Sequence, residues 1–76
     1  MSERLPRLTS KDLIRALKKL GFFEVRSRGS HFILMDADGR RKVTVPLHAG
    51  KILPIGTMKG ILDDAEITAE ALREVL

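Results

Sequence analysis

The sequence contains no cysteine, no tryptophan and no tyrosine, and only three phenylalanines. Without cysteine there is no disulfide framework, no thiolate nucleophile and no cysteine-based zinc site. No apolar run approaches the roughly 20 residues that span a bilayer. The segment from Met1 to Thr9 also lacks the apolar centre of a secretory signal. We therefore expect a soluble, cytoplasmic protein with no membrane association.

The chain has 76 residues, which is enough for one small domain. A chain of this size buries only about 60% of the surface that its unfolded form exposes. There is room for two or three helices and one small sheet. We expect residues 1–76 to form a single domain, with residues 1–8 as a flexible arm.

The charges are unevenly distributed along the chain. The net charge is +4, but residues 1–28 carry eight Lys or Arg against three acids, and residues 29–60 carry five against two. Residues 61–76 carry one Arg against five acids. A basic front and middle favour contact with a polyanion such as a nucleic acid, and the acidic end favours solvent or a different partner.

The first regular element is a predicted helix over residues 11–20. Leu13, Ile14, Leu17 and Leu20 recur at helical spacing, Thr9 or Ser10 can cap the start, and Gly21 follows the end. Its other faces carry basic residues that either face solvent or contact a phosphate backbone, namely Lys11, Arg15 and Lys18.

Three strands are predicted next, over residues 22–28, 30–35 and 41–45. Gly29 marks the first turn, and the run from Asp36 to Gly39 marks the second. Simple alternation puts Phe23 and Val25 on one face of the first strand. The opposite face of that strand then carries Glu24, Arg26 and Arg28.

The remainder is predicted to be a loop followed by two helices. The first helix opens at residues 55–57 with Thr57 or Gly56 as its N-cap, and its apolar stripe consists of Met58, Ile61, Leu62 and Ala65. Thr68 caps a last short helix that reaches Leu76. Short connections require the strands to form an antiparallel meander, so we expect an α+β fold with helices on one face of the sheet.

The other face of the sheet then lies open. On the first and third strands it carries Glu24, Arg26, Lys42 and Thr44. If Phe32 and Leu34 face the core, then His31, Ile33 and Met35 share the open face. Exposed apolar residues beside a polar site are typical of a partner-binding surface.

Three motifs resemble the HicA, or YcfA-like, family of toxins. They are the run from Lys11 to Phe22, the tetrapeptide Arg28-Gly29-Ser30-His31, and Val45-Pro46-Leu47-His48 followed by the run from Ile55 to Leu62. The resemblance extends over about residues 8–76. It implies a fold similar to the double-stranded RNA-binding domain, with the order α-β-β-β-α. Asp63-Asp64-Ala65-Glu66 departs from the family, in which this end is more often basic.

The resemblance also implies a function. Members of the family are ribosome-independent mRNA endonucleases that a cognate HicB antitoxin neutralises. The histidine of Gly-Ser-His is the family's catalytic residue, and that position is His31 here.

A histidine suits proton transfer because its ordinary pKa, about 6.5, lies near neutral pH. RNA can be cleaved when its own 2′-OH attacks the adjacent phosphate, with His31 as general acid or base. Arg26, Arg28 and Lys42 could neutralise phosphate charge, and Ser30 could donate a hydrogen bond to a phosphate oxygen. Gly29 could allow a close backbone approach. His48 is either the second proton-transfer group or an ordinary loop residue.

Other functions remain open from the sequence. A non-catalytic RNA-binding module and a protein-interaction module both fit the pattern. A serine-hydrolase pair of Ser30 and His31 does not fit, because adjacent strand residues point to opposite faces. Two histidines with no acidic cluster beside them give no reason to expect a metal, and we expect no cofactor.

Overall fold

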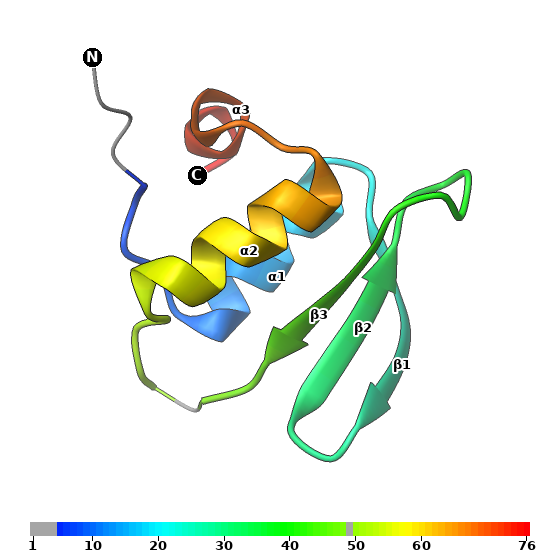
Figure 1. The fold of residues 1–76 in the computed structure, drawn as a ribbon, viewed down its shortest axis with the longest axis horizontal. Coiled ribbons are helices and arrows are strands. Elements are labelled where there is room, and N and C mark those ends of the chain that lie inside the picture. Colours follow the sequence, from blue (N-terminus) through cyan, green and yellow to red (C-terminus); the bar gives the residue numbers. More distant parts are fainter. Residues whose placement is uncertain (1–4, 49) are drawn as a thin grey trace.

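The computed structural model describes residues 5–48 and 50–76. Its elements follow the predicted order, and Figure 1 shows their arrangement. They are α1 (Ser10–Lys19), β1 (Phe23–Arg28), β2 (His31–Met35), β3 (Lys42–Pro46), α2 (Ile55–Ala65) and α3 (Ala69–Glu74). The strands form one antiparallel sheet in the order β1-β2-β3. The predicted α+β fold is confirmed.

Helix α1 begins and ends where its local sequence indicates. The hydroxyl of Thr9 accepts a hydrogen bond from the backbone N–H of Asp12 at 3.2 Å, which caps the helix. Leu13 and Leu17 are fully buried. Gly21 follows the last turn with a φ of 101°, a value that glycine adopts without strain.

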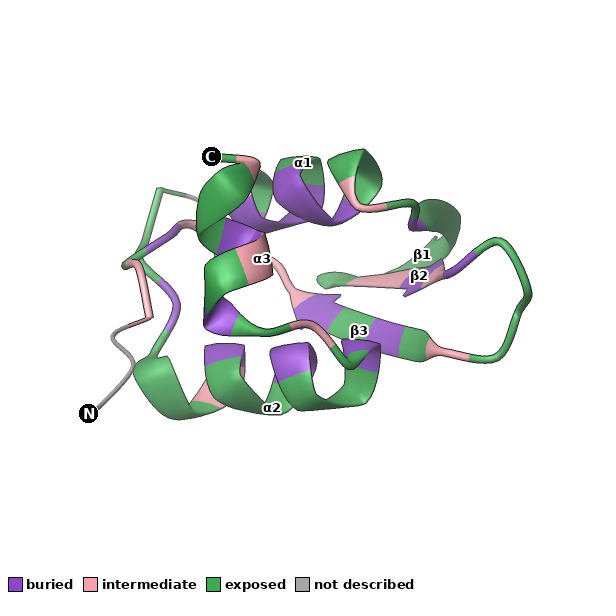
Figure 2. Ribbon diagram, turned by 90° about the horizontal axis from the view of Figure 1, so that it is seen from above, coloured by how far each residue is buried: buried purple, intermediate pink, exposed green. Residues whose placement is uncertain are grey.

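The helices lie against one face of the sheet, as Figures 1 and 2 show. On that face the side chains of Leu34, Val43 and Val45 are buried. They pack in one core with residues of α1, α2 and α3, including Leu13, Met58 and Leu72. This core leaves the opposite face of the sheet uncovered.

Strand β1 departs from simple alternation. Glu24 pairs with Leu34 and Arg26 pairs with Ile33, so Val25 is the extra residue of a β-bulge. Because Leu34 faces the core, Glu24 lies on the helix side, where its carboxylate is 3.6 Å from the ammonium group of Lys18. Phe23 pairs with Met35 and is 50% exposed. The predicted faces of Phe23 and Glu24 were therefore wrong, whereas those of Arg26 and Arg28 were right.

The second helix starts earlier than predicted. Its N-cap is Pro54, which makes no side-chain capping bond, and Gly56 and Thr57 lie inside the helix. Proline has no backbone N–H to lose, and its fixed φ suits the beginning of a helix. The cap of α3 agrees with the prediction, because the hydroxyl of Thr68 accepts from the N–H of Ala71 at 3.0 Å.

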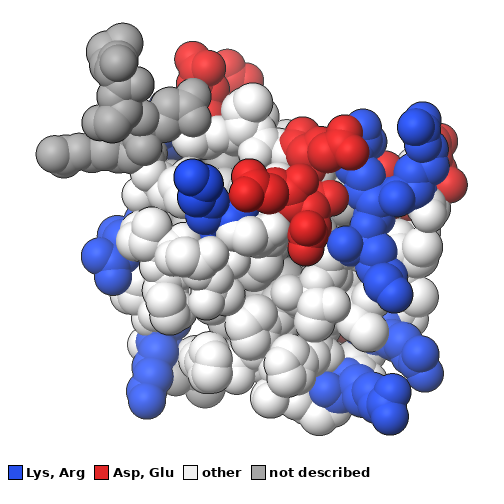
Figure 3. All heavy atoms as spheres, in the orientation of Figure 1, with Lys and Arg blue, Asp and Glu red and all other residues white. Residues whose placement is uncertain are grey.

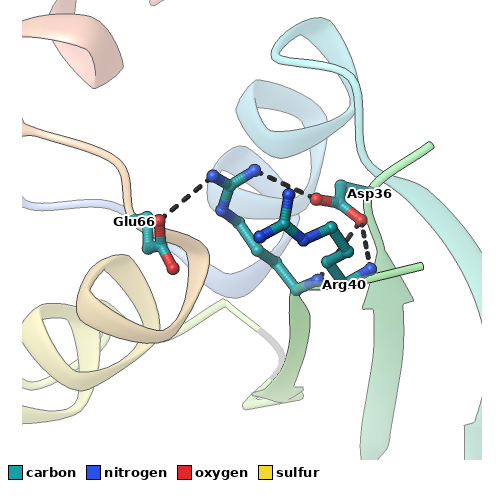
Figure 4. Close-up of polar contacts among 4 residues, drawn as sticks. Asp36, Arg40 and Glu66 are labelled. Atoms are coloured by element: carbon teal, nitrogen blue, oxygen red, sulfur yellow. Dashed lines mark hydrogen bonds and ion pairs between the residues drawn. The ribbon is translucent and has the colours of Figure 1, made fainter. Parts of the chain in front are cut away.

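A charged network joins the β2–β3 turn to the end of α2. Asp36 accepts hydrogen bonds from the backbone N–H groups of Arg40 and Arg41 at 2.9 and 3.2 Å. The guanidinium of Arg41 donates to Asp36 at 3.1 Å and to Glu66 at 3.0 Å. Figure 4 shows Asp36 and Glu66 on opposite sides of this bridge.

The network shifts the pKa values of its members. Burial acts to raise the pKa of Asp36, but the hydrogen bonds from Arg41 and Arg40 and the nearby positive charge outweigh it. The pKa therefore lies below its ordinary value. The hydrogen bond and charge of Glu66, supported by Asp36, raise the pKa of Arg41.

The first residues of the described chain lie against the rest of the fold. Leu8 is buried, and its carbonyl oxygen accepts a 2.8 Å hydrogen bond from the N–H of Leu53. Leu5 packs against the core. Of the predicted arm over residues 1–8, residues 1–4 lie outside the described residues. No helix within residues 5–48 and 50–76 is long and apolar enough to cross a membrane.

Candidate nucleic-acid interface and active site

The tight turn between β1 and β2 positions His31. Gly29 has a φ of 59°, whereas Ser30 does not have a positive φ. This pattern matches a type II′ turn, which takes glycine at its first central position. The turn places Arg28 directly opposite His31. Gly29 therefore serves the turn, and nothing lies within 4 Å of where its side chain would begin.

The open face of the sheet carries three rows of paired residues. The row that contains His31 runs from Arg28 through His31 to Pro46. The next rows are Arg26, Ile33 and Thr44, and then Phe23, Met35 and Lys42. Three of these nine residues are cationic and none is acidic.

The β-bulge explains why none of these nine residues is acidic. With regular alternation, Glu24 would share a face with Arg26 and Arg28. The extra residue at Val25 sends Glu24 to the helix side and keeps both arginines on the open face. Among the nine paired residues, His31 is exposed beside cations and has no acidic neighbour.

The open face also has an apolar part. Phe23 is 50% exposed, and its partner Met35 and the neighbouring Ile33 are half-buried. The sequence predicted Ile33 and Met35 here. It missed Phe23, since the bulge leaves no signal in the alternation of residues.

Pro46, the pairing partner of His31, is held by a residue at the start of α1, on the helix side of the sheet. The hydroxyl of Ser10, which is buried, donates a 2.6 Å hydrogen bond to the carbonyl oxygen of Pro46. The hydroxyl oxygen of Ser10 in turn accepts a 3.3 Å hydrogen bond from the N–H of His48. The N–H of Leu47 donates to the carbonyl oxygen of Ser30 at 2.6 Å. Sequence reasoning considered Ser10 only as a helix cap and missed this role.

The two histidines lie near the same end of the sheet. His48 comes two residues after Pro46, the residue opposite His31. A cavity of about 330 Å³ lies between the start of α1 and the loop after β3. It is lined by Thr9, Ser10, Lys11, Leu47, His48 and Gly50. Two predicted site residues, Lys11 and His48, thus share one cavity beside the sheet edge.

Arg15 and Lys18, the other two residues of α1 predicted to contact RNA, lie beside acidic side chains. Arg15 lies 3.7 Å from Asp12 in an exposed pair, and Lys18 lies near Glu24. Arg15 also lines a separate cavity with Val75 and Leu76, so the structure does not bring it to the sheet. Such exposed pairs contribute only about 0–1 kcal/mol to stability.

The distribution of charge separates two regions of the surface. Figure 3 shows acidic side chains gathered where α2 ends and α3 lies, with Lys and Arg side chains along the side that carries the sheet. The acids of the last turn of α2, of the connection to α3 and of α3 itself are Asp63, Asp64, Glu66, Glu70 and Glu74. Within the described part of the chain, no group of three or more His, Asp or Glu side chains gathers where it could hold a metal ion.

Comparison with known families agrees with the earlier resemblance. A family model described as the HicA toxin of bacterial toxin–antitoxin systems matches residues 10–67. This range begins with α1 and runs just past α2, so it contains the whole sheet and both histidines. No curated protein matches the sequence.

Proposed function

Because the chain belongs to the HicA family of bacterial toxins, we propose that it is an endoribonuclease that cleaves mRNA with His31 as general acid or base. One observation carries the proposal. His31 is exposed at the start of β2, opposite Arg28 and on the same carboxylate-free face as Arg26 and Lys42. An imidazole next to fixed positive charge suits proton transfer at a phosphodiester.

The proposed reaction uses the RNA's own 2′-OH as nucleophile. His31 either takes the proton from the 2′-OH or supplies a proton to the leaving 5′-oxygen, and water makes the other of these two proton transfers. The 2′-oxygen bonds to phosphorus as the bond from phosphorus to the 5′-oxygen breaks. The products are a 2′,3′-cyclic phosphate and a 5′-OH. No redox partner is required, and the proposal assigns no step to a metal.

The neighbouring residues have supporting parts in this proposal. Arg28 and Arg26 would neutralise the charge that builds up on the phosphate, and Lys42 would attract the strand further along the face. The Ser30 hydroxyl would donate a hydrogen bond to a phosphate oxygen. Ser10 acts at a distance, since it holds Pro46 against His31.

The test is a cleavage assay on purified protein with single-stranded RNA, in the presence of a chelator. We expect wild-type protein to cleave and His31→Ala to be slower by about 10²- to 10⁴-fold, the usual contribution of a general acid or base. An RNA with 2′-deoxy sugars should not be cleaved. Ser27→Ala changes an exposed residue of β1 outside the proposed site and is the control variant, which should cleave like wild type.

Two results would contradict the proposal. If His31→Ala cleaves as fast as wild type, His31 is not the catalytic residue. If the RNA binds in a salt-sensitive way but no products form, the protein is a non-catalytic RNA-binding module of the same fold.

Membership of this family implies an antitoxin partner. We propose that a HicB-type antitoxin covers the apolar part of the open face and so blocks access to His31. The exposed ring of Phe23 beside Met35 supports this, because exposed apolar residues on a small protein mark a contact surface. Phe23→Ser should weaken neutralisation by the antitoxin while free protein still cleaves RNA. Unchanged neutralisation would contradict this docking site.

A further inference from the structure

The cavity between the start of α1 and the loop after β3 is not used by the proposed reaction. It has a volume of about 330 Å³, at the lower end of the range of roughly 300–1,000 Å³ typical of ligand sites. A cavity of this size accepts one small ring system rather than an extended ligand. None of the six described residues that line it is acidic.

The wall of the cavity is continuous with the candidate active site. The N–H of Leu47 donates to the carbonyl oxygen of Ser30, so the pairing of β2 with β3 continues past His31 and Pro46. Leu47 and His48 then form one side of the cavity. The lining of the cavity therefore begins one residue after Pro46, the pairing partner of His31.

The loop around the cavity is held at both ends. Near its start, the buried Ser10 hydroxyl bonds to Pro46 and His48. Near its end, Ile52 bridges to Thr9 and the N–H of Leu53 bonds to Leu8. These bonds fix both ends of the loop, as expected of a ligand site that is largely formed in advance.

The residues around the cavity match the chemistry of a nucleobase. His48 is exposed, and its ring is the one aromatic group among the lining residues. Leu47 adds an apolar surface, and Lys11 adds a positive charge for the adjoining phosphate. Unpaired RNA bases commonly stack on aromatic side chains, including histidine.

We propose that this cavity binds a single unpaired nucleobase next to the cleaved phosphate, with the base stacked on His48. The inference rests on the proposed function, because it takes RNA as the substrate. It assigns His48 to substrate recognition, so this residue has a part in where the RNA is cut.

The test measures binding of a short, fully 2′-O-methylated single-stranded RNA, which keeps its bases but lacks the attacking hydroxyl. One nucleotide at a time is replaced by an abasic unit. Base stacking of this kind corresponds to about a five- to hundredfold change in Kd. We expect one abasic position to weaken binding to wild-type protein by that factor. His48→Ala should weaken binding of the intact RNA similarly, and the same abasic unit should then cause no further loss.

Two further variants separate stacking from charge. His48→Phe keeps an aromatic ring and should retain most of the affinity, whereas His48→Lys supplies a positive charge without a ring and should not. The reverse result would overturn the proposal, and so would unchanged affinity in all His48 variants. Cleavage of unmodified RNA by wild type and His31→Ala is measured separately. If His31→Ala cleaves as fast as wild type, the proposed function is contradicted. If the His48 variants bind RNA as tightly as wild type, only the base-binding cavity is contradicted.

Discussion

The hydroxyl of Ser10 donates a 2.6 Å hydrogen bond to the carbonyl oxygen of Pro46, which lies 36 residues further along the chain. Pro46 is also the residue opposite His31 in the sheet. One buried serine at the start of α1 therefore connects the covering helix to the strand beside the candidate catalytic residue. This contact couples the stability of the fold to the geometry of the site.

Removal of this hydroxyl should lower the stability of the fold. Ser10→Ala leaves the carbonyl oxygen of Pro46 and the N–H of His48 without their shared partner. We expect the free energy of unfolding to fall by about 1–3 kcal/mol, measured by urea denaturation. The exposed change Ser27→Ala should stay within about 0.5 kcal/mol of wild type. Equal effects of the two substitutions would show that the buried bond adds nothing.

Two glycine substitutions should have opposite signs. Gly29 has a φ of 59°, so Gly29→Ala forces a side chain into the left-handed region and should cost about 1–2 kcal/mol. Gly60 lies inside α2 with nothing within 4 Å of an added Cβ. Gly60→Ala should therefore stabilise the protein by about 0.5–1 kcal/mol. Thermal unfolding of both variants gives the comparison, and stabilisation by Gly29→Ala would contradict the type II′ turn.

The network around Asp36 should make stability depend on acid pH. The pKa of Asp36 is lowered from its ordinary value of 3.8 in the folded state, so the folded state binds fewer protons than the unfolded state in that range. The stabilisation that ionised Asp36 gives the folded state is complete above pH 3.8. It is lost as the pH falls through the lower pKa of the folded state. The stability difference between wild type and Asp36→Asn should therefore shrink over that interval.

Two neighbouring arginines provide the control for this pH dependence. Arg41→Ala removes the guanidinium that bonds to Asp36 and Glu66 and should weaken the pH dependence. Among the bonds described, Arg40 bonds to Asp36 only through its backbone N–H, which Arg40→Ala retains. This variant should therefore keep the pH dependence of wild type. Denaturation curves at several acid pH values test both variants. An equal loss in the two variants would mean that charge in general, rather than the Arg41 bridge, is responsible.

The cations of the open face should determine the salt dependence of RNA binding. The binding constant falls as salt rises, and each phosphate contact to single-stranded RNA adds about 0.7 to the magnitude of the slope of log K against log salt concentration. Arg26→Ala and Arg28→Ala should each lower the slope by about that amount. Lys59→Ala removes the same charge from exposed α2, away from the sheet, and should leave the slope unchanged. An equal drop for Lys59 would indicate diffuse attraction rather than binding at the sheet.

Local sequence determined the elements of this protein well, because their signals lie within a few residues. Thr9, the apolar spacing from Leu13 to Leu17 and the glycine that follows were enough to predict α1. Gly29 and Gly39 marked the two turns of the meander, and both have a positive φ. The strands on either side, and hence the antiparallel sheet, follow from those turns. The position of His31 at the start of β2 could be predicted in the same way.

Tertiary structure decided which residues share a surface. The bulge at Val25 is a feature of the pairing between β1 and β2, so alternation within β1 could not predict it. That bulge exposes Phe23 and leaves the face around His31 without a carboxylate. The bond from Ser10 to Pro46 and the cavity at His48 join segments far apart in the chain. Only packing of the helices against the sheet brings such segments together, because no local pattern specifies contacts over that distance.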